Sequence, residues 1–364
     1  MKVFFHVQHL LGIGHLKRAA TLARAMTADG IDVTLASGGM PVDGVEVLQL
    51  PPASSDASFK SLLDERGRPV DDAWKARRRD ALLEAWRASD ADVLMIELFP
   101  FGRRQMRFEL LPLLDAAKAR PRRPLVVCSA RDLIQWRPTR EPEMLETFER
   151  YFDRLLVHGD PAVARFNFGL VGKISDRLHY TGYVVSDIQG SEAGTGEVLV
   201  SAGGGAVGQP LLEAALDARP LTSLRERPWR LLAGVNASES ALAALRGRAG
   251  PGVTVERARQ DFTARLANCV LSVSQAGYNT VMETLTARAR AVIVPFAGGG
   301  EAEQTMRTRL LVARGLVEMV EEEALTAPSL AAAIERALKR PKPTPGEIDL
   351  DGAVATARLL RQWR

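Results

Sequence analysis

The sequence predicts an α/β protein built from two Rossmann-like, doubly wound domains in tandem. Short apolar runs alternate with helical patterns along nearly the whole chain of 364 residues, which is typical of parallel β-α-β units. That length fits two domains of ordinary size. Around residues 179–197 the chain becomes polar and rich in glycine, which marks a domain boundary. We therefore expect an N-terminal domain over residues 1–186 and a C-terminal domain over residues 187–364, whose last helix can pack back on the first domain.

Buried strands are expected at regular intervals in both halves. In the first half they fall at residues 2–8, 32–37, 45–50, 92–97, 124–130 and 154–160. In the second half they fall at residues 197–205, 229–235, 253–258, 269–275, 291–298 and 316–320. A helix over residues 15–30 follows the first strand, with Gly30 at its C-terminus. The polar segment at residues 54–80 is interpreted as a long excursion that contains some helix.

Composition and charge narrow the class of protein. The chain is 46% hydrophobic and 25% charged, as soluble globular proteins are. Its formal net charge of +4, without a clustered basic face that carries stacking aromatics, does not indicate a nucleic-acid partner. Cys128 and Cys269 lie inside apolar runs, so buried, reduced thiols are expected rather than a zinc site or a redox pair. No segment approaches the ~20 consecutive apolar residues of a membrane span, and the expected location is the cytoplasm.

The first motif is a glycine loop between a strand and a helix, in the stretch VLVSAGGGAVGQPLLEAAL. Gly203, Gly204 and Gly205 follow the strand directly. Glycines let the backbone approach a ligand closely, and the following helix N-terminus favours a diphosphate. A tight turn without a ligand is the alternative for this motif.

The second motif is AGYNTVME at residues 276–283. The preceding strand is expected to end at Ser274, Gly277 provides a tight turn, and a helix is expected to begin near residue 278. Asn279 and Thr280 then lie in the first helical turn, where backbone N–H groups can bind a phosphate. Glu283 lies one turn beyond Asn279 on the same face, where a carboxylate can accept both hydroxyls of a ribose. Simple capping of the helix is the alternative.

The third motif is VPFAGGGEAEQTMRTRLL at residues 294–311. A strand ends at Pro295, a glycine loop follows, and Glu303 and Gln304 open the next helix. Adjacent acidic and amide side chains can hydrogen-bond several sugar hydroxyls at once. These two residues could also serve only as helix caps.

The order of these motifs resembles the donor-binding half of GT-B glycosyltransferases, in particular the family of the UDP-N-acetylglucosaminyltransferase that makes peptidoglycan lipid II. The resemblance implies two domains that face each other across a cleft. It also implies a nucleotide-sugar donor, UDP-linked as in UDP-N-acetylglucosamine, which is a co-substrate, so that no cofactor is needed. In that family the residue matching Glu283 binds the ribose and the residue matching Gln304 contacts the donor sugar.

The resemblance extends over nearly the whole chain. GIGHLKRAATLARAM, which contains Gly14, resembles the glycine loop at the start of that family, and HYTGYV resembles its Thr-Gly motif. The block DVLMIELFPFGRRQMRFEL resembles a subgroup of uncharacterised predicted glycosyltransferases. Gln275 stands where the lipid II enzyme has an arginine, so the donor base and sugar stay open.

Inverting sugar transfer needs a base that takes the proton of the acceptor hydroxyl. His15, in a glycine loop after the first strand, is the first candidate, and Glu97 at another strand end is the alternative. Arg131, Asp132 and His158 also follow or end strands and are candidates for the acceptor side. No residue cluster has the spacing of a metal site, and GT-B enzymes generally stabilise the departing diphosphate without a metal.

Residues 99–140 form a basic segment with ten Lys or Arg and three acidic residues. Together with Phe99, Phe101, Met106 and Phe108, it resembles an amphipathic surface that can rest on anionic lipid, which would suit a lipid-linked acceptor and a peripheral position on the inner face of the membrane. A helix packed on the sheet with a solvated basic face is the alternative. A small-molecule acceptor also fits.

Other activities on the same fold remain open from the sequence. The pattern of residues 12–18, GIGHLKR, resembles nucleotide-sugar hydrolases in which the matching histidine activates water. Nucleotide-sugar 2-epimerases share the fold and turn over the donor without an acceptor. A non-catalytic sugar-nucleotide sensor would keep Glu283 and the glycine loops without needing His15 or Glu97.

Overall fold

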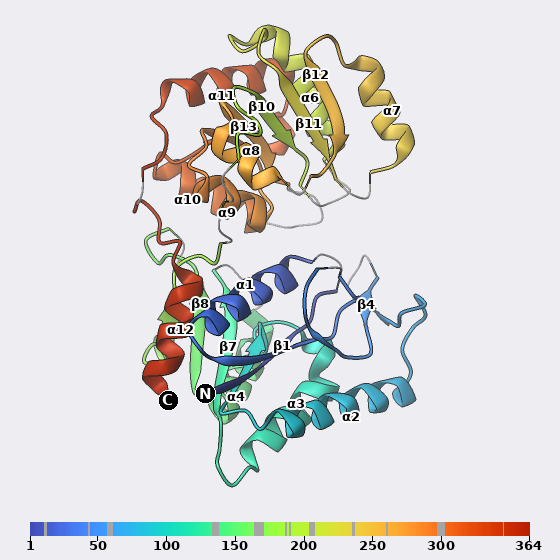
Figure 1. Cartoon of the computed structure of the whole chain (residues 1–364), viewed down its shortest axis with the longest axis vertical. Helices are drawn as coiled ribbons and strands as arrows, with labels where there is room; N and C mark the ends of the chain where they lie inside the picture. The colour runs from blue at the N-terminus through green and yellow to red at the C-terminus, as the bar shows by residue number, and fades with distance from the viewer. Residues whose placement is uncertain are drawn as a thin grey trace. The chain divides into compact units, whose positions relative to one another are not determined.

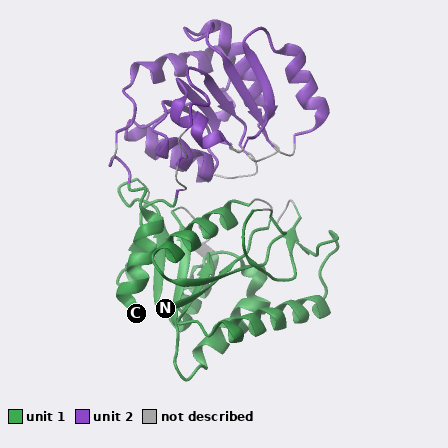
Figure 2. Cartoon of the chain, in the orientation of Figure 1, with its two compact units in different colours: residues 1–184, 349–364 green, residues 185–348 purple. Residues whose placement is uncertain are grey.

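The computed structural model describes the chain except residues 11–12, 43, 57–60, 133–137, 164–170, 186–187, 189–190, 204–207, 235–236, 260, 297–302 and 345. The chain divides into two compact units (Figures 1 and 2). Unit 1 contains Met1–Val184 and Asp349–Arg364, and unit 2 contains Val185–Ile348. The boundary expected after residue 186 thus lies two residues from this division, and the last helix belongs to unit 1.

Unit 1 is built on a parallel sheet with the strand order β3-β2-β1-β6-β7-β8-β9. These strands are β1 (Lys2–Val7), β2 (Asp32–Ser37), β3 (Leu48–Gln49), β6 (Val93–Glu97), β7 (Leu125–Arg131), β8 (Arg154–His158) and β9 (Leu178–Tyr180). The strand expected at residues 45–50 is reduced to β3, and β9 was not predicted. The excursion at residues 54–80 contains a short antiparallel pair, β4 (Ser54–Ser55) and β5 (Leu62–Leu63), before a helix starts.

Helices cover both faces of this sheet (Figure 1). They are α1 (Gly14–Ala28), α2 (Asp72–Ser89), α3 (Arg107–Lys118), α4 (Glu141–Tyr151), α5 (Val171–Ile174) and α12 (Gly352–Trp363), with 3-10 turns at Arg104–Met106 and Pro138–Arg140. Strand residues alternate between the faces. Phe4 packs in the core under α2, α3 and α4, whereas Phe5 packs under α1 and α12. Gly30, at φ +75°, follows the C-cap Asp29 and ends α1.

Unit 2 has a parallel sheet in the order β12-β11-β10-β13-β14-β15. Its strands are β10 (Val198–Ser201), β11 (Trp229–Ala233), β12 (Val253–Arg257), β13 (Leu271–Gln275), β14 (Ala291–Val294) and β15 (Glu318–Met319). Its helices are α6 (Gln209–Ala218), α7 (Glu239–Arg248), α8 (Phe262–Asn268), α9 (Tyr278–Thr286), α10 (Glu303–Ala313) and α11 (Ala327–Lys339), with 3-10 turns at Arg219–Leu221 and Glu322–Ala324. The predicted strands of this half are all present, and the expected α/β architecture is confirmed for both units.

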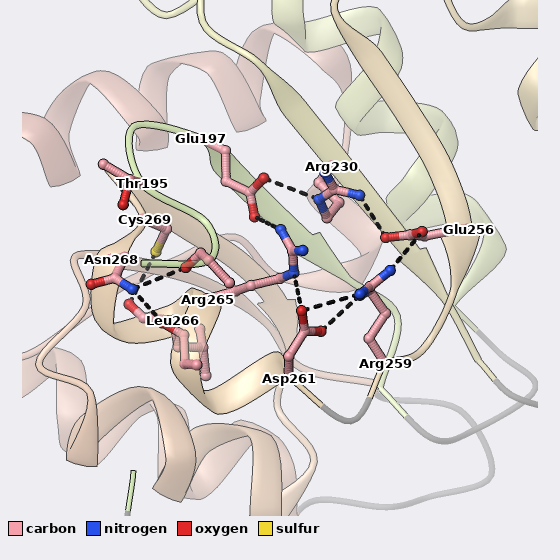
Figure 3. Close-up of polar contacts among 12 residues, drawn as sticks. Thr195, Glu197, Arg230, Glu256, Arg259, Asp261, Arg265, Leu266, Asn268 and Cys269 are labelled. Carbon is pink, nitrogen blue, oxygen red and sulfur yellow. Dashed lines mark hydrogen bonds and ion pairs between the residues drawn. The ribbon is translucent and has the colours of Figure 1, made fainter. Parts of the chain in front are cut away.

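A closed ring of ion pairs ties α8 to the sheet of unit 2 (Figure 3). Glutamates and an aspartate alternate with arginines around the ring, with N–O distances between 2.6 and 3.3 Å. Its members in order are Glu197, Arg230, Glu256, Arg259, Asp261 and Arg265. Because every charge has two opposite neighbours, ordering one side chain serves two pairs, and the entropic cost per pair is lower than for isolated surface pairs.

We predict that Asp261→Asn destabilises unit 2 by about 1–2 kcal/mol at pH 7, since hydrogen bonds from Arg259 lower the pKa of Asp261 to about 2. A carboxyl group whose pKa is lowered on folding contributes its full stabilisation at pH values above its unfolded pKa of 3.8. The difference from wild type should therefore shrink as pH falls from 4 toward 2. Urea unfolding of both proteins across this range measures it. Asp217→Asn, in the exposed pair with Arg248, is the control and should cost under about 0.5 kcal/mol.

Candidate functional site

Each sheet has a topological switch point, where ligands bind in doubly wound folds. In unit 1 the chain proceeds from β1 outward to β2 and β3, then returns to β6 on the other side of β1. The helix α1 begins just after β1, and Glu97 is the last residue of β6. The carboxyl ends of adjacent parallel strands meet at one edge, which brings His15 and Glu97 to the same place although 82 residues separate them.

His15 and Glu97 form a hydrogen-bonded pair at this edge. His15 Nδ1 lies 2.7 Å from Glu97 Oε1, and Arg18 Nη2 donates to the same oxygen at 2.6 Å. The side chains of Glu97 and Arg18 are 1% and 4% exposed, whereas that of His15 is 18% exposed. Only the histidine of this group therefore has appreciable contact with solvent. Arg18 was not predicted as a site residue, although its i+3 spacing from His15 places both on one helical face.

The charges of this group follow from burial and from its arginines. Burial lowers the pKa of His15 to about 3, with Arg103 and Arg18 adding to the effect and the Glu97 charge opposing it. Burial acts to raise the pKa of Glu97, but His15, Arg18 and Arg103 together bring it well below its usual range. At neutral pH the carboxyl is therefore ionised and the imidazole is neutral.

An ionised carboxylate can only accept hydrogen bonds, so the 2.7 Å contact assigns the proton to Nδ1. A contact between Arg18 Nη2 and His15 Nδ1 is much longer, at 3.4 Å, and does not compete. Nε2 of His15 then carries the free lone pair, and within the described part of the chain it has no hydrogen-bond partner. This arrangement presents a proton acceptor to a ligand.

The three candidates for the acceptor side lie at the carboxyl ends of β7 and β8, and their side chains differ in exposure to solvent. Arg131, the last residue of β7, is half-buried and lies on the same face of the sheet as Glu97 by strand alternation. Asp132 is fully buried and accepts a hydrogen bond from the Tyr183 hydroxyl at 3.1 Å. Of these two side chains, only that of Arg131 is accessible to a ligand.

His158, at the end of β8, has no exposed surface. Its ring nitrogens lie 2.8 Å from Ser129 Oγ and 2.9 Å from Thr181 Oγ1. Burial lowers its pKa to about 3. This neutral ring links β7, β8 and the segment after β9, a geometry that fits a structural role.

In unit 2 the switch point lies between β10 and β13, which are adjacent and parallel. Ser201 pairs with Ser274 at their carboxyl ends. A methyl group placed on Gly203 or on Gly277 would lie 3.9 Å from the Thr280 hydroxyl, so the two glycine turns converge on the first turn of α9. Gly203 has a φ of +68°, which favours glycine. The predicted Gly204 and Gly205 lie outside the described residues.

The helix α9 begins at Tyr278, as the glycine turn before it predicts. Its N-cap, Gly277, offers no side-chain hydrogen bond, which leaves the first-turn N–H groups available to an anion. Ser274 Oγ is buried and has no hydrogen-bond partner within the described segments. Asn279 and Glu283 are half-buried on the same helix. Ser274 and Asn279 thus flank the turn at Gly277, and Glu283 lies one helical turn further along α9.

The start of α10 meets the start of α9. Arg307 lies over the Tyr278 ring at 5.1 Å and donates to Glu303 at 2.7 Å. Gln304 accepts a hydrogen bond from the Phe296 backbone N–H at 3.1 Å through its side-chain oxygen. The amide nitrogen of Gln304 has no partner among the residues described, and it can donate to a ligand.

The basic segment at residues 99–140 differs from the amphipathic surface that we considered. Phe99, Phe101 and Met106 are buried in the core of unit 1, and Phe108 packs against that core. Several of its arginines form ion pairs with acidic residues outside the segment, namely Asp92, Glu143 and Asp153. These four side chains are covered by the core, so the described part of the segment offers no support for membrane binding.

Metal-binding clusters and membrane spans are both absent from the described residues. These residues contain no group of three or more His, Cys, Asp or Glu side chains placed to hold a metal ion. None of their helices is long and apolar enough to cross a membrane. Both cysteines are buried and free, as expected.

Comparison with known sequences finds a family match in the second half of the chain. Residues 199–347 match the glycosyltransferase family 28 C-terminal domain. Two curated relatives are UDP-N-acetylglucosamine–N-acetylmuramyl-(pentapeptide) pyrophosphoryl-undecaprenol N-acetylglucosamine transferases. The Anaeromyxobacter enzyme is 35% identical over 82 residues, 22% of this chain and 22% of the relative. The Rhodospirillum centenum enzyme is 32% identical over 108 residues, 29% of this chain and 28% of the relative. The matches thus span less than a third of either relative.

Solved structures resemble the chain over its whole length. MurG of Acinetobacter baumannii superposes with a TM-score of 0.65 at 13% identity, covering 99% of each chain. The spinosyn rhamnosyltransferase SpnG, complexed with thymidine diphosphate, superposes with a TM-score of 0.61 at 16% identity over 100% of each chain. Such identities establish the fold alone. The chain therefore has the GT-B glycosyltransferase fold, and its residues 199–347 match the model of the glycosyltransferase family 28 C-terminal domain.

Proposed function

We propose that the protein transfers a sugar from a nucleotide-sugar donor to an acceptor hydroxyl with inversion and without a bound metal. The observation that carries the proposal is the 2.7 Å contact between His15 Nδ1 and Glu97. It holds a neutral imidazole with Nε2 open at the strand edge where this fold binds ligands. The family match of residues 199–347 supports a glycosyl-transfer reaction.

In this mechanism His15 Nε2 accepts the proton of the acceptor hydroxyl while the hydroxyl oxygen attacks the anomeric carbon of the donor sugar. The bond between that carbon and the diphosphate oxygen breaks, and the nucleoside diphosphate leaves with the electron pair. Glu97 stabilises the imidazolium that forms and keeps the ring oriented. Glu97 thus supports the base, because its Oε1 already accepts hydrogen bonds from His15 and Arg18.

The donor is proposed to bind at the switch point of unit 2. Gly203, Gly277 and the first turn of α9 would hold the diphosphate through backbone N–H groups. Glu283 would accept the ribose hydroxyls, and Gln304 would donate to the sugar. UDP-N-acetylglucosamine is the proposed donor, because the curated relatives are named for that sugar nucleotide. The acceptor is a lipid-linked or small-molecule hydroxyl.

Glu283→Ala is predicted to weaken UDP binding about 10–100-fold, since hydrogen bonds to a charged group contribute about 1.5–3 kcal/mol. Isothermal titration calorimetry with UDP measures this directly. Glu213→Ala, on the solvent-facing side of α6, removes an equal charge from the same unit and should leave the affinity unchanged. Equal UDP affinity in both variants would remove Glu283 from the donor site.

Product analysis by mass spectrometry tests the reaction. The purified protein is incubated with a panel of nucleotide sugars, with and without a cell lipid extract. Nucleoside diphosphate release that needs the extract, together with a glycosylated lipid, supports a transferase with a lipid-linked acceptor. Free sugar or an epimer formed without any acceptor would overturn the transferase assignment in favour of a hydrolase or an epimerase.

A further inference from the structure

We propose that Arg18 is a positioning residue, whose guanidinium holds the Glu97 carboxylate ionised and in place against His15 Nδ1. The neutral His15 ring then keeps Nε2 as its proton-accepting nitrogen. The catalytic meaning of this inference rests on the proposed function. The tautomer and the charge of the ring, in contrast, are properties of the protein without any substrate.

Arg18 and His15 both contact the same carboxylate oxygen of Glu97. Arg18 lies three residues after His15 on α1, so both side chains project from one helical face toward β6. Arg18 Nη2 and His15 Nδ1 reach Glu97 Oε1 at 2.6 and 2.7 Å. The side chains of Glu97 and Arg18 are almost completely buried. A carboxylate so buried remains charged only when a cation accompanies it.

Two arrangements of charge compete in this group. Without the Arg18 guanidinium, the Glu97 carboxylate would favour protonation of His15 and form an imidazolium–carboxylate pair. With Arg18 in place, the carboxylate already has its cation, and an additional positive charge on the ring is disfavoured. An imidazolium cannot act as a base, so the arginine keeps the ring in the reactive form.

The other charged and titratable groups around the pair do not reverse this balance. Arg103, in the loop after β6, is held by a hydrogen bond from its Nε to the Gln8 carbonyl at 2.7 Å. It adds positive charge near Glu97 and His15. Among the residues that the structure describes, the neighbours also include His9 (which interacts with Arg103), Arg131 and Cys128 on β7, and His158 on β8. Of these, Cys128 and His158 are neutral at pH 7, because burial raises the thiol pKa and lowers the imidazole pKa.

The test is an NMR titration of the full chain labelled with ¹⁵N-histidine. The chain has five histidines, and the spectrum of His15→Asn assigns the His15 signals. In wild type the ring should be neutral and protonated on Nδ1 from pH 8 to 4. In Arg18→Gln its titration midpoint should rise by about one unit or more, as expected for removing a unit charge about 4 Å away at an effective dielectric constant between about 20 and 80.

Arg24→Gln is the matched control, since Arg24 lies on the same helix, is exposed and donates a hydrogen bond to Thr21. Its midpoint should equal that of wild type. Arg18→Lys keeps the charge without the planar fork and should give a midpoint between wild type and Arg18→Gln. A wild-type ring protonated on Nε2 would overturn the inference, as would equal midpoints in Arg18→Gln and Arg24→Gln.

Activity separates this inference from the proposed function. If transfer is confirmed, kcat of Arg18→Gln should fall at low pH and recover as pH rises through the new His15 midpoint. If the protein transfers no sugar but the NMR shifts appear as described, the proposed function fails and the role of Arg18 toward His15 stands. An active enzyme with an unchanged His15 midpoint in Arg18→Gln would instead support the proposed function and overturn the role of Arg18.

Discussion

His15→Ala is expected to reduce sugar transfer about 10²–10⁴-fold, the usual contribution of a general base. The side chain is partly exposed, and its removal leaves the donor motifs of unit 2 unchanged, so UDP affinity should equal that of wild type. Steady-state kinetics with the donor and acceptor found by product analysis measure the loss of kcat. Calorimetry with UDP measures the affinity.

Lys17→Ala is the control for this prediction, because Lys17 is an exposed residue close to His15 on α1. It should keep full activity. The pH dependence adds a second readout. With a folded pKa of about 3, His15 is neutral at every pH above that value, so the wild-type rate should show no acidic limb from His15 between pH 5 and 8. Normal turnover in His15→Ala would show that His15 is not the general base.

Arg78→Met is expected to destabilise unit 1 by about 3–5 kcal/mol, the cost of leaving a buried charge unpaired. Arg78 and Glu109 are both fully buried. Arg78 donates to both Glu109 oxygens at 2.7 and 2.9 Å and to the carbonyls of Gly38 and Pro51, each at 2.7 Å. With the Gln8 side chain also bound, all five guanidinium donors are used. Urea unfolding, followed by tryptophan fluorescence, measures the loss.

The neighbouring Arg77→Met is the matched control, since Arg77 is exposed on the same helix, and it should change stability by less than about 0.5 kcal/mol. The double variant Arg78→Met/Glu109→Leu should recover much of the loss, because it removes both buried charges. A single variant as stable as the control would show that the buried pair contributes nothing net. Gln8 also accepts from Arg103 through its carbonyl, which connects this buried pair to the neighbourhood of Glu97.

Local patterns in the sequence predicted most of the strands, though not β9 or the short pair β4 and β5. They also predicted the start of α9 after Gly277 and the start of α10 at Glu303, and these two predictions are confirmed. They depend on neighbouring residues, since periodicity, glycine turns and buried apolar runs act over a few positions. The same patterns could not separate a solvated basic face from a lipid-binding one. That question depends on whether Phe99, Phe101 and Met106 are covered, and residues distant in sequence cover them.

The pairing of His15 with Glu97 shows the same limit more sharply. The sequence presented the two side chains as alternative bases, because each follows or ends a strand. Strand order places β1 beside β6, and alternation turns Glu97 toward α1, so the two become partners in one hydrogen bond. The spacing of Arg18 from His15 could be seen in the sequence, but its role could be inferred only from its contact with Glu97 in the folded chain.

Sequence patterns were enough to predict the α/β fold class. They also led to the predictions of a division near residue 186 and of polar site residues at the strand ends of each half. The folded chain was needed to learn which of these groups touch, which are buried, and which charges they carry. The physical reason is that secondary structure follows from short-range sterics and hydrophobic periodicity, whereas pKa and tautomer depend on burial and on charges brought together from distant segments. The carboxylate of Glu97 joins His15 and Arg18 only in the folded chain.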